Sequence, residues 1–309
     1  MTTTVLETSN PDEILEYTGL ILKEHTSNLQ SWKILQTLDK DEMLFIEGQH
    51  QSTKSDEYIY HETFVHSLMC GLTNPKNVLI LGGGEGCMAR EVLKWPTVQN
   101  VRQVDWDAAL VEYFKTDGWA WNGGAYSNQR VHVSCVEALG WLKTCRDLYD
   151  AIFIDLLDPE MEDLEFMKEL ILAAKEHVAP NGGLSVNAGE VKAQPTPACA
   201  LAKWMETEFT EPQFYRNAVH VDVPSYKGKW CFLMAEPRLW SRNLQMNTYP
   251  ANLRLFSKEF AHKAYLWPRY YPDALQNFWK PTAKEYSGRE KLVAGPIYDY
   301  GKDSGHYGC

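Results

Sequence analysis

The stretch Asn-Val-Leu-Ile-Leu-Gly-Gly-Gly-Glu-Gly-Cys-Met-Ala-Arg, residues 77–90, constrains the fold more than any other part of this chain. An apolar segment of strand type, residues 78–81, ends in a glycine cluster, and a helix-like segment follows. A glycine turn between strand and helix lets the backbone approach a ligand closely, and the new helix end presents free N–H groups. This order predicts an α/β domain that binds a nucleoside-like group, through Gly82, Gly83, Gly84 and Gly86.

Two acids near this turn indicate the kind of nucleoside. Asp105 ends the next apolar segment about twenty residues later, the usual position of an acid that binds a ribose hydroxyl pair. The dinucleotide fingerprint requires a third glycine where this chain has Cys87. Glu85 at the helix start suits a ligand with a positive centre, so we favour an S-adenosyl sulfonium compound over NAD. Alternatively, Glu85 only interacts with the helix dipole as a first-turn acid.

Composition limits the partners and the compartment. A net charge of −11 argues against a nucleic-acid partner and for small or cationic ones. The seven cysteines are scattered and never form a C-x-x-C pair, so we expect reduced thiols and no metal site. Neither a signal pattern nor an apolar run of about eighteen residues occurs, which predicts a cytoplasmic protein without a membrane partner.

The chain divides into three parts by its pattern. Residues 1–68 show short apolar runs split by turn residues, which predicts a small N-terminal domain of antiparallel strands and turns. Residues 69–237 alternate strand and helix patterns from residue 77 on, which predicts a Rossmann-like α/β fold with a doubly wound, mostly parallel sheet. Two strand-like runs within 215–235 predict an antiparallel hairpin at its edge. Residues 238–309 lack clear periodicity and predict an irregular C-terminal extension.

The individual elements of the central part follow from the same periodicity. The expected strands are 78–81, 101–105, 131–135, 150–155 and 183–187. The expected helices are 86–95, 107–117, 137–143 and 164–178. The carboxyl ends of these strands are where we expect a ligand to bind.

Acids gather at these strand ends. Six acids occur within the eleven residues that start at Asp155. Asp155 and Asp158, beside Glu85, repel one another unless cations share the site, so the cluster would bind a polyamine and could accept a proton from an ammonium. Alternatively, this loop is a solvated acidic cap of the next helix. Glu137 either accepts a hydrogen bond from an adenine amino group or only caps its own helix.

Four blocks resemble motifs of the aminopropyltransferase family, the spermidine, spermine and thermospermine synthases. They are residues 48–62, Gly-Gln-His-Gln-Ser-Thr-Lys-Ser-Asp-Glu-Tyr-Ile-Tyr-His-Glu; residues 82–91, with the glycine turn; residues 155–159, Asp-Leu-Leu-Asp-Pro; and residues 223–226, Val-Pro-Ser-Tyr, followed by Trp230. The resemblance covers about residues 34–236, with the motifs in the family's order. At two motif positions, the residues of this chain, Glu85 and Trp230, most resemble those of the thermospermine synthase branch.

The resemblance implies a role for each matching residue. Tyr60, with Asp155 or Asp158, would orient and deprotonate an attacking amine. Glu85 and Asp155 would hold the aminopropyl ammonium of decarboxylated S-adenosylmethionine, a co-substrate rather than a prosthetic group. The other expected binding residues are Gln51 beside donor and acceptor, Asp105 at the ribose, Glu137 at the adenine, and His61, Asn187, Tyr226 and Trp230 around the polyamine acceptor. Family habit also implies a homodimer.

The chain departs from the family pattern at three points near the site. Val136-Glu137-Ala138 stands where the family has a small Gly-Asp pattern, and Asn187 replaces a glutamine. The loop after Pro159 is more acidic and lacks the family's glycines. These positions concern adenine binding and the shape of the acceptor pocket.

Two other functions fit the same scaffold. The first is an N-methyltransferase that uses S-adenosylmethionine itself, but the carboxylate of that donor would face Glu85 and Asp155. The second is a non-catalytic polyamine-binding protein, which has little reason to keep both Asp155 and Asp158.

Overall fold

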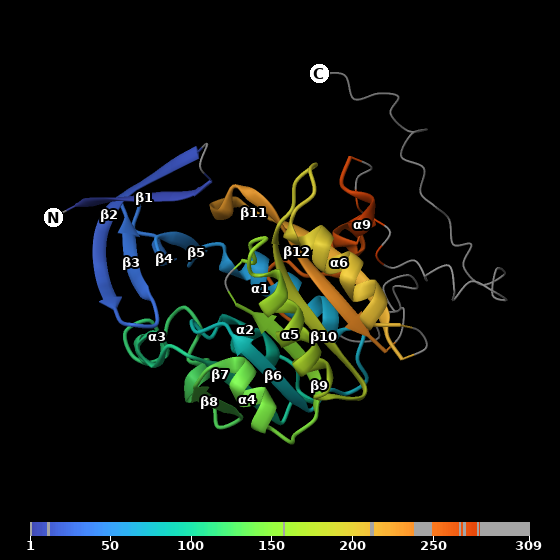
Figure 1. Cartoon of the computed structure of the whole chain (residues 1–309). Coiled ribbons are helices and arrows are strands. Elements are labelled where there is room, and N and C mark those ends of the chain that lie inside the picture. Colours follow the sequence, from blue (N-terminus) through green and yellow to red (C-terminus); the bar gives the residue numbers. More distant parts are fainter. Residues whose placement is uncertain are drawn as a thin grey trace.

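The computed structural model contains two β-sheets and the helices that cover them (Figure 1). It describes residues 2–10, 13–156, 158–210, 213–237, 249–265, 267, 270–276 and 278. The N-terminal sheet is antiparallel with the order β1-β2-β3-β4-β5, and the seven-stranded sheet has the order β11-β12-β10-β9-β6-β7-β8. The N-terminal sheet, blue in Figure 1, lies at one side of the larger sheet.

The N-terminal sheet is joined to the rest by an apolar cluster. Its strands are β1 (Thr3–Asn10), β2 (Glu13–Thr26), β3 (Ser31–Thr37), β4 (Glu42–Ile46) and β5 (Gln49–Thr53). Alternate residues of β3 and β4, such as Ile34 and Leu44, pack against Leu110 and Phe114 of α3 (Ala108–Lys115). Because side chains of a strand alternate between its two faces, this packing aims one face of the sheet at the end of the larger sheet.

The larger sheet confirms the predicted α/β topology. Five strands run parallel: β6 (Asn77–Gly82), β7 (Asn100–Asp105), β8 (Val131–Cys135), β9 (Tyr149–Asp155) and β10 (Val178–Glu190). The predicted antiparallel hairpin is formed by β11 (Tyr215–Val223) and β12 (Gly228–Glu236), and β12 pairs antiparallel with β10. Parallel strands bring their carboxyl ends to one edge, so the acids that end them meet there.

Helices cover both faces of this sheet because its strands are apolar on both faces. In β6, Val78 and Ile80 pack toward α1 and α2, whereas Leu79 and Leu81 pack toward α4, α5 and α6. Each such fully buried side chain contributes roughly 1.5–3 kcal/mol. The helices are α1 (Glu57–Met69), α2 (Cys87–Leu93), α4 (Ala138–Thr144), α5 (Leu164–Lys175) and α6 (Pro197–Glu208).

Helix α1 differs from the expectation of strands and turns before residue 68. Its side chains are buried from Tyr60 to Met69, so no polar stripe marks it as a helix in the sequence. Helix α6 was also missing from the expected set, although Pro197 at its first turn is a typical helix start. Both helices are recognised only once the sheet that buries them is known.

The C-terminal extension predicted for residues 238–309 is described only in part. Residues 238–248 and those after 278 lie outside the described residues. The described part contains two short helices, α8 (Lys258–Ala264) and α9 (Asp273–Gln276). Glu62 of α1 accepts hydrogen bonds from the main-chain N–H groups of residues 254–256 at 2.8–2.9 Å, which ties this segment to α1. Within the residues that the structure describes, no helix is both long and apolar enough to cross a membrane.

Candidate active site

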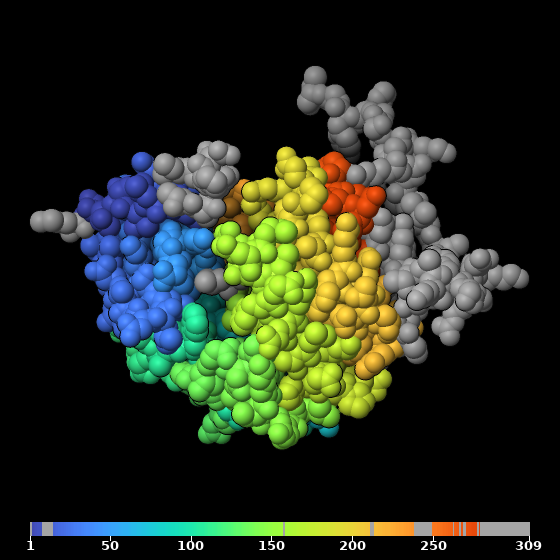
Figure 2. Space-filling view, viewed as in Figure 1, coloured from blue at the N-terminus to red at the C-terminus, as the bar shows by residue number. Residues whose placement is uncertain are grey.

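A cavity of about 520 Å³ opens at the carboxyl ends of the parallel strands, under the N-terminal sheet. In Figure 2 the blue N-terminal sheet and the yellow-green segment after β9 lie on opposite sides of this opening. The cavity is lined by Gln51, Tyr60, His61, Gly82, Gly83, Gly84, Glu85, Asp105, Glu137, Asp155, Asp158, Asn187, Tyr226 and Trp230. Of the predicted site residues only Gly86 is outside this lining; it precedes α2 with a φ of 80°.

Hydrogen bonds from two side chains hold the glycine turn after β6 in place. Gly82 has a φ of 86°, and a Cβ there would lie 2.0 Å from the carbonyl oxygen of Asp155, so only glycine fits. The Gln103 amide donates to the carbonyl oxygens of Gly82 at 2.9 Å and Gly83 at 2.5 Å. The Tyr126 hydroxyl donates to the carbonyl oxygen of Gly84 at 2.7 Å. The turn is therefore held in one conformation and forms part of the cavity surface.

Asp105 lies beside this turn at the end of β7. One of its oxygens accepts from the main-chain N–H of Asp107 at 2.9 Å. The other lies so close to Gly84 that a Cβ there would be only 2.9 Å away. Burial, opposed by the Asp107 hydrogen bond and aided by the charges of Glu85 and Asp107, raises the pKa of Asp105 to about 6. A buried carboxylate at the edge of the cavity can accept further hydrogen bonds from ligand hydroxyl groups.

Glu85 belongs to a buried chain of charged groups. His61 of α1 contacts Glu85 through Nε2 at 2.8 Å and the Glu57 carboxylate through Nδ1 at 2.9 Å. Burial alone would lower the pKa of His61, but the hydrogen bonds to Glu57 and Glu85 outweigh it and raise the pKa to about 10. Arg90 in turn donates to Glu57 at 2.8 Å. At neutral pH this chain therefore alternates in charge, with an imidazolium between two carboxylates.

Asp155 lies next to Glu85, where β9 ends. The Tyr60 hydroxyl donates to Asp155 Oδ1 at 2.7 Å. Burial, and then the negative charge of Glu85, raise the pKa of Asp155 to about 7, although His61 and the Tyr60 hydrogen bond oppose the shift. A partly buried carboxyl with a pKa near neutrality, facing a cavity, has the character of a general base.

Asp158 is held on the other side of the cavity. It accepts hydrogen bonds from the Asn187 amide at 2.8 Å and from the Trp230 indole N–H at 2.9 and 3.0 Å. Burial raises its pKa, against these two hydrogen bonds. Tyr226 packs edge-to-face on Trp230, with ring centroids 4.7 Å apart, and its hydroxyl donates to the Gln51 carbonyl oxygen at 2.5 Å. Tyr226 and Trp230 thus form an aromatic wall of the cavity, and the Asp158 carboxylate lies against it.

Comparisons with known proteins agree with this arrangement. Residues 57–246 match the protein-family model of the spermine/spermidine synthase domain, which is more than half of the chain. The chain belongs to this family. A polyamine aminopropyltransferase from Sulfolobus acidocaldarius is 31% identical over 290 residues, which cover 89% of this chain and 92% of that protein. One from Saccharolobus solfataricus is 35% identical over 196 residues, covering 62% of this chain and 63% of that protein.

Solved structures show the same fold. A spermidine synthase in complex with the transition-state analogue AdoDATO matches this family member with a TM-score of 0.77 and 20% identity, over 89% of this chain and 95% of that one. The spermidine synthase from Thermotoga maritima matches with a TM-score of 0.74 and 21% identity, over 89% and 94% of the two chains. The predicted family and fold class are therefore confirmed.

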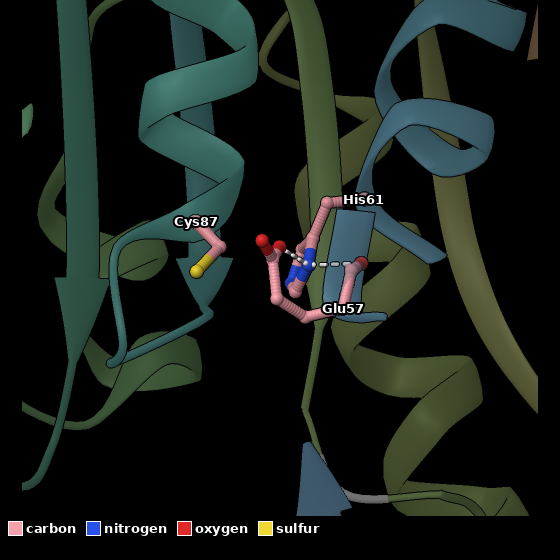
Figure 3. A group of neighbouring side chains, drawn as sticks. All are labelled: Glu57, His61 and Cys87. Atoms are coloured by element: carbon pink, nitrogen blue, oxygen red, sulfur yellow. Dashed lines mark hydrogen bonds and ion pairs between the residues drawn. The ribbon is translucent and has the colours of Figure 1, made fainter. Parts of the chain in front are cut away.

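Two groups of potential metal ligands occur at or behind the cavity, within the described residues. One is Glu57, His61 and Cys87 (Figure 3), and the other is His61, Glu85 and Asp155, whose ligand atoms lie within 4.8 Å of one another. Both depend on His61, whose two ring nitrogens already contact carboxylates. Burial also raises the pKa of the Cys87 thiol well above its ordinary value. In this structure Glu57 and Glu85 both pair with His61.

Glu137 caps helix α4 and also lines the cavity. Both of its oxygens accept main-chain N–H groups of α4, from Leu139 at 2.7 Å and Gly140 at 2.6 Å. It also lines the cavity, so a contact with adenine stays a prediction. The helix cap is the part of its role that the structure describes.

Several residues that hold the site together leave little signal in the sequence. Gln103 is a fully buried polar side chain inside an apolar strand, a pattern that signals a specific partner. Glu57 and Arg90 lie inside recognised motifs, yet their pairing joins α1 to α2 and leaves no local signal. Trp106 and Phe166 also line the cavity and add to its apolar surface.

Proposed function

We propose that this family member transfers an aminopropyl group from decarboxylated S-adenosylmethionine to a polyamine and releases methylthioadenosine. Membership in the spermine/spermidine synthase family supports aminopropyl transfer, and the relatives from Sulfolobus acidocaldarius and Saccharolobus solfataricus are named polyamine aminopropyltransferases. The observation that carries the choice of donor is the charge of the cavity. Six acids line it among the described residues, and neither lysine nor arginine does: Glu85, Asp105, Glu137, Asp155, Asp158 and Asp163.

This charge pattern suits two cationic substrates. The sulfonium and ammonium of the donor would relieve the repulsion between Glu85 and Asp155, whose oxygens come within 4.8 Å of each other. Asp105 would accept the ribose hydroxyl pair and Glu137 would face the adenine. Asp158, set into the aromatic wall, would bind the acceptor amine. Gln51, Asn187, Tyr226 and Trp230 would shape the path of the acceptor chain.

The proposed reaction is a direct displacement. The acceptor nitrogen attacks the methylene carbon beside sulfur, the new C–N bond forms, and the C–S bond breaks with its electron pair left on sulfur. The acceptor nitrogen loses one proton, which Asp155 accepts. The Tyr60 hydroxyl donates a hydrogen bond to Asp155 and keeps that carboxylate in place. Binding both substrates in line next to this carboxylate would supply most of the rate gain.

The N-methyltransferase alternative is less compatible with the cavity. S-adenosylmethionine carries a carboxylate where the decarboxylated donor has only an ammonium. The cation that lines the cavity among the described residues is His61, and both of its ring nitrogens are engaged with Glu57 and Glu85. Arg90 is turned toward Glu57, Glu91 and the carbonyl oxygen of Trp121. The carboxylate of S-adenosylmethionine would therefore be repelled by Glu85 and Asp155.

The nature of the released nucleoside tests the proposal. The purified protein is incubated with spermidine and either decarboxylated S-adenosylmethionine or S-adenosylmethionine, and the products are identified by mass spectrometry. We expect methylthioadenosine from the first donor and no turnover of the second. Release of S-adenosylhomocysteine would replace our proposal with methyl transfer, and silence with putrescine and spermidine alike would favour a binding protein.

The pKa of Asp155 predicts how activity depends on pH. Its value of about 7, against an ordinary value of 3.8, means that the proton-accepting form of the free enzyme is lost as pH falls below about 7. We expect kcat/KM to decrease by about tenfold per pH unit there, measured by steady-state kinetics. A profile that stays flat down to about pH 5 would contradict Asp155 as the base.

The raised pKa of Asp155 also predicts how the stability of the ligand-free protein depends on pH. Because the folded protein holds the Asp155 proton more tightly than the unfolded chain, ligand-free stability should decrease as pH rises from about 4 through about 7. Asp105, with a pKa of about 6, adds to this trend. Asp155→Asn should make the decline shallower in thermal melts, and an unchanged slope would contradict the assignment.

Acceptor choice and assembly belong to the same proposal. Glu85 in the glycine turn and Trp230 beside Asp158 support an acceptor of the thermospermine synthase branch, a longer polyamine than putrescine. We further propose that the enzyme is a homodimer, as the family resemblance implies, and that it works in the cytoplasm. Comparison of initial rates with putrescine and spermidine tests the first point, and light scattering tests the second.

A further inference from the structure

Behind Glu85 lies a buried series of charged side chains that the reaction itself does not use. We name Glu85, His61, Glu57 and Arg90 the His61 chain; its three contacts measure 2.8, 2.9 and 2.8 Å. His61 is 1% exposed, Glu57 is 3% exposed and Glu85 is 9% exposed. Burying this many charges is unfavourable unless they are paired, so the arrangement requires an explanation.

We propose that His61 is a positioning residue that fixes Glu85 for the ammonium of the donor, while Glu57 and Arg90 fix His61. This rests on the proposed function, because it concerns how that same site holds its donor. Although His61 lines the cavity, both of its ring nitrogens are engaged, so in this proposal it acts through Glu85 rather than as the acceptor-binding residue that the resemblance implies. In this arrangement it sets the affinity for the aminopropyl part of the donor and leaves the nucleoside part unaffected.

The contacts of Glu85 carry the argument. One carboxylate oxygen, Oε1, faces His61 Nε2, and the carbonyl oxygen of Glu85 accepts from the Asn122 amide at 3.0 Å. The other carboxylate oxygen has no hydrogen bond from any described side chain, and Glu85 lines the cavity. A glutamate is flexible, and holding one oxygen removes most of the conformational freedom that ligand binding would otherwise have to restrict.

The other end of the chain explains why a cation sits there. Without a positive charge between them, Glu57 and Glu85 would repel each other in a buried environment. His61 donates to both, and hydrogen bonds between ionised partners are roughly twice as strong as neutral ones. Arg90 is anchored in turn by Glu91 at 2.8 Å and by the carbonyl oxygen of Trp121 at 2.6 Å.

Two ligands that share the nucleoside and differ in the aminopropyl group and the sulfonium charge test this. In the full chain, His61→Asn places an amide within reach of Glu57 but too short to reach Glu85. Isothermal titration should show decarboxylated S-adenosylmethionine binding weakened by roughly ten- to a hundredfold, and methylthioadenosine, which lacks that ammonium, changed by less than about threefold. His61→Gln, which is longer and can still donate to Glu85, should recover part of the donor affinity.

His66→Gln is the matched control. His66 lies farther along the same helix, is as deeply buried, and contacts Glu91 at 3.0 Å, but it does not line the cavity. It should leave the affinities for both ligands unchanged, because Lys94 still holds Glu91 at 2.6 Å and Glu91 still anchors Arg90. In kinetics, His61→Asn should raise the KM of the donor and leave the KM of the amine acceptor unchanged.

Several results would overturn the proposal. Equal weakening of both ligands would mean that His61 only supports the site as a whole, and unchanged donor affinity in both His61 variants would mean that Glu85 needs no support. If His61→Asn does not fold, His61→Gln and its donor-to-methylthioadenosine affinity ratio decide the matter, and a wild-type ratio overturns the proposal. Failure of the wild-type protein to release methylthioadenosine would instead refute the proposed function.

Discussion

Replacing Asp155 with asparagine should reduce turnover by about a thousandfold or more and leave the fold intact. The variant keeps the shape of the side chain and an oxygen that can accept from Tyr60, which lies 2.7 Å away in the wild type. It loses the charge that would bind the donor ammonium and the base that would accept the proton. Release of methylthioadenosine under saturating substrates measures the effect.

The stability of the variant separates chemistry from folding. Because burial and the charge of Glu85 disfavour ionised Asp155, removing that charge should leave the melting temperature unchanged or raise it. Glu162→Gln is the matched control, since it removes one charge from the same acidic loop at an exposed position outside the cavity lining. Asp155→Asn with the activity of Glu162→Gln would mean that Asp155 is only a loop acid.

The sequence was sufficient for the parts of the site that depend on local pattern. Apolar segments, the glycine turn and an acid at the end of each segment predicted where Gly82, Asp105 and Asp155 would lie, because parallel strands place their carboxyl ends together. The burial of Leu79 and Leu81 on one face and Val78 and Ile80 on the other follows from the same strand geometry.

The remaining parts depend on contacts between distant segments. Tyr60 reaches Asp155 only because α1 packs against the large sheet, and α1 has no polar stripe to reveal it. Trp230 reaches Asp158 from the edge hairpin. Composition and periodicity carry no information on such pairings, so only the family resemblance could indicate these residues. The Glu57–Arg90 pair was missed even so, because each residue alone resembles an ordinary surface charge.

Asp105→Ala should raise the KM of the donor by about a hundredfold with a much smaller change in kcat. The ribose hydroxyl pair would lose its acceptor and stay buried without a partner, whereas the reacting carbon and the amine would keep their surroundings. Methylthioadenosine contains the same ribose, so its affinity should decrease in parallel, unlike the pattern expected for His61→Asn. Asp105→Asn, which keeps one oxygen to accept from the Asp107 N–H, should be intermediate.

The neighbouring helix offers the control for this variant. Glu112 lies on α3 at an exposed position, so Glu112→Gln removes a nearby negative charge without touching the cavity and should bind methylthioadenosine as the wild type does. A rise in the acceptor KM in place of the donor KM, or unchanged methylthioadenosine binding in Asp105→Ala, would assign Asp105 to the polyamine side. Weakening of both ligands by the substitution at 105, and of the donor alone by the substitution at 61, would show that nucleoside and ammonium are held by separate carboxylates of one cavity.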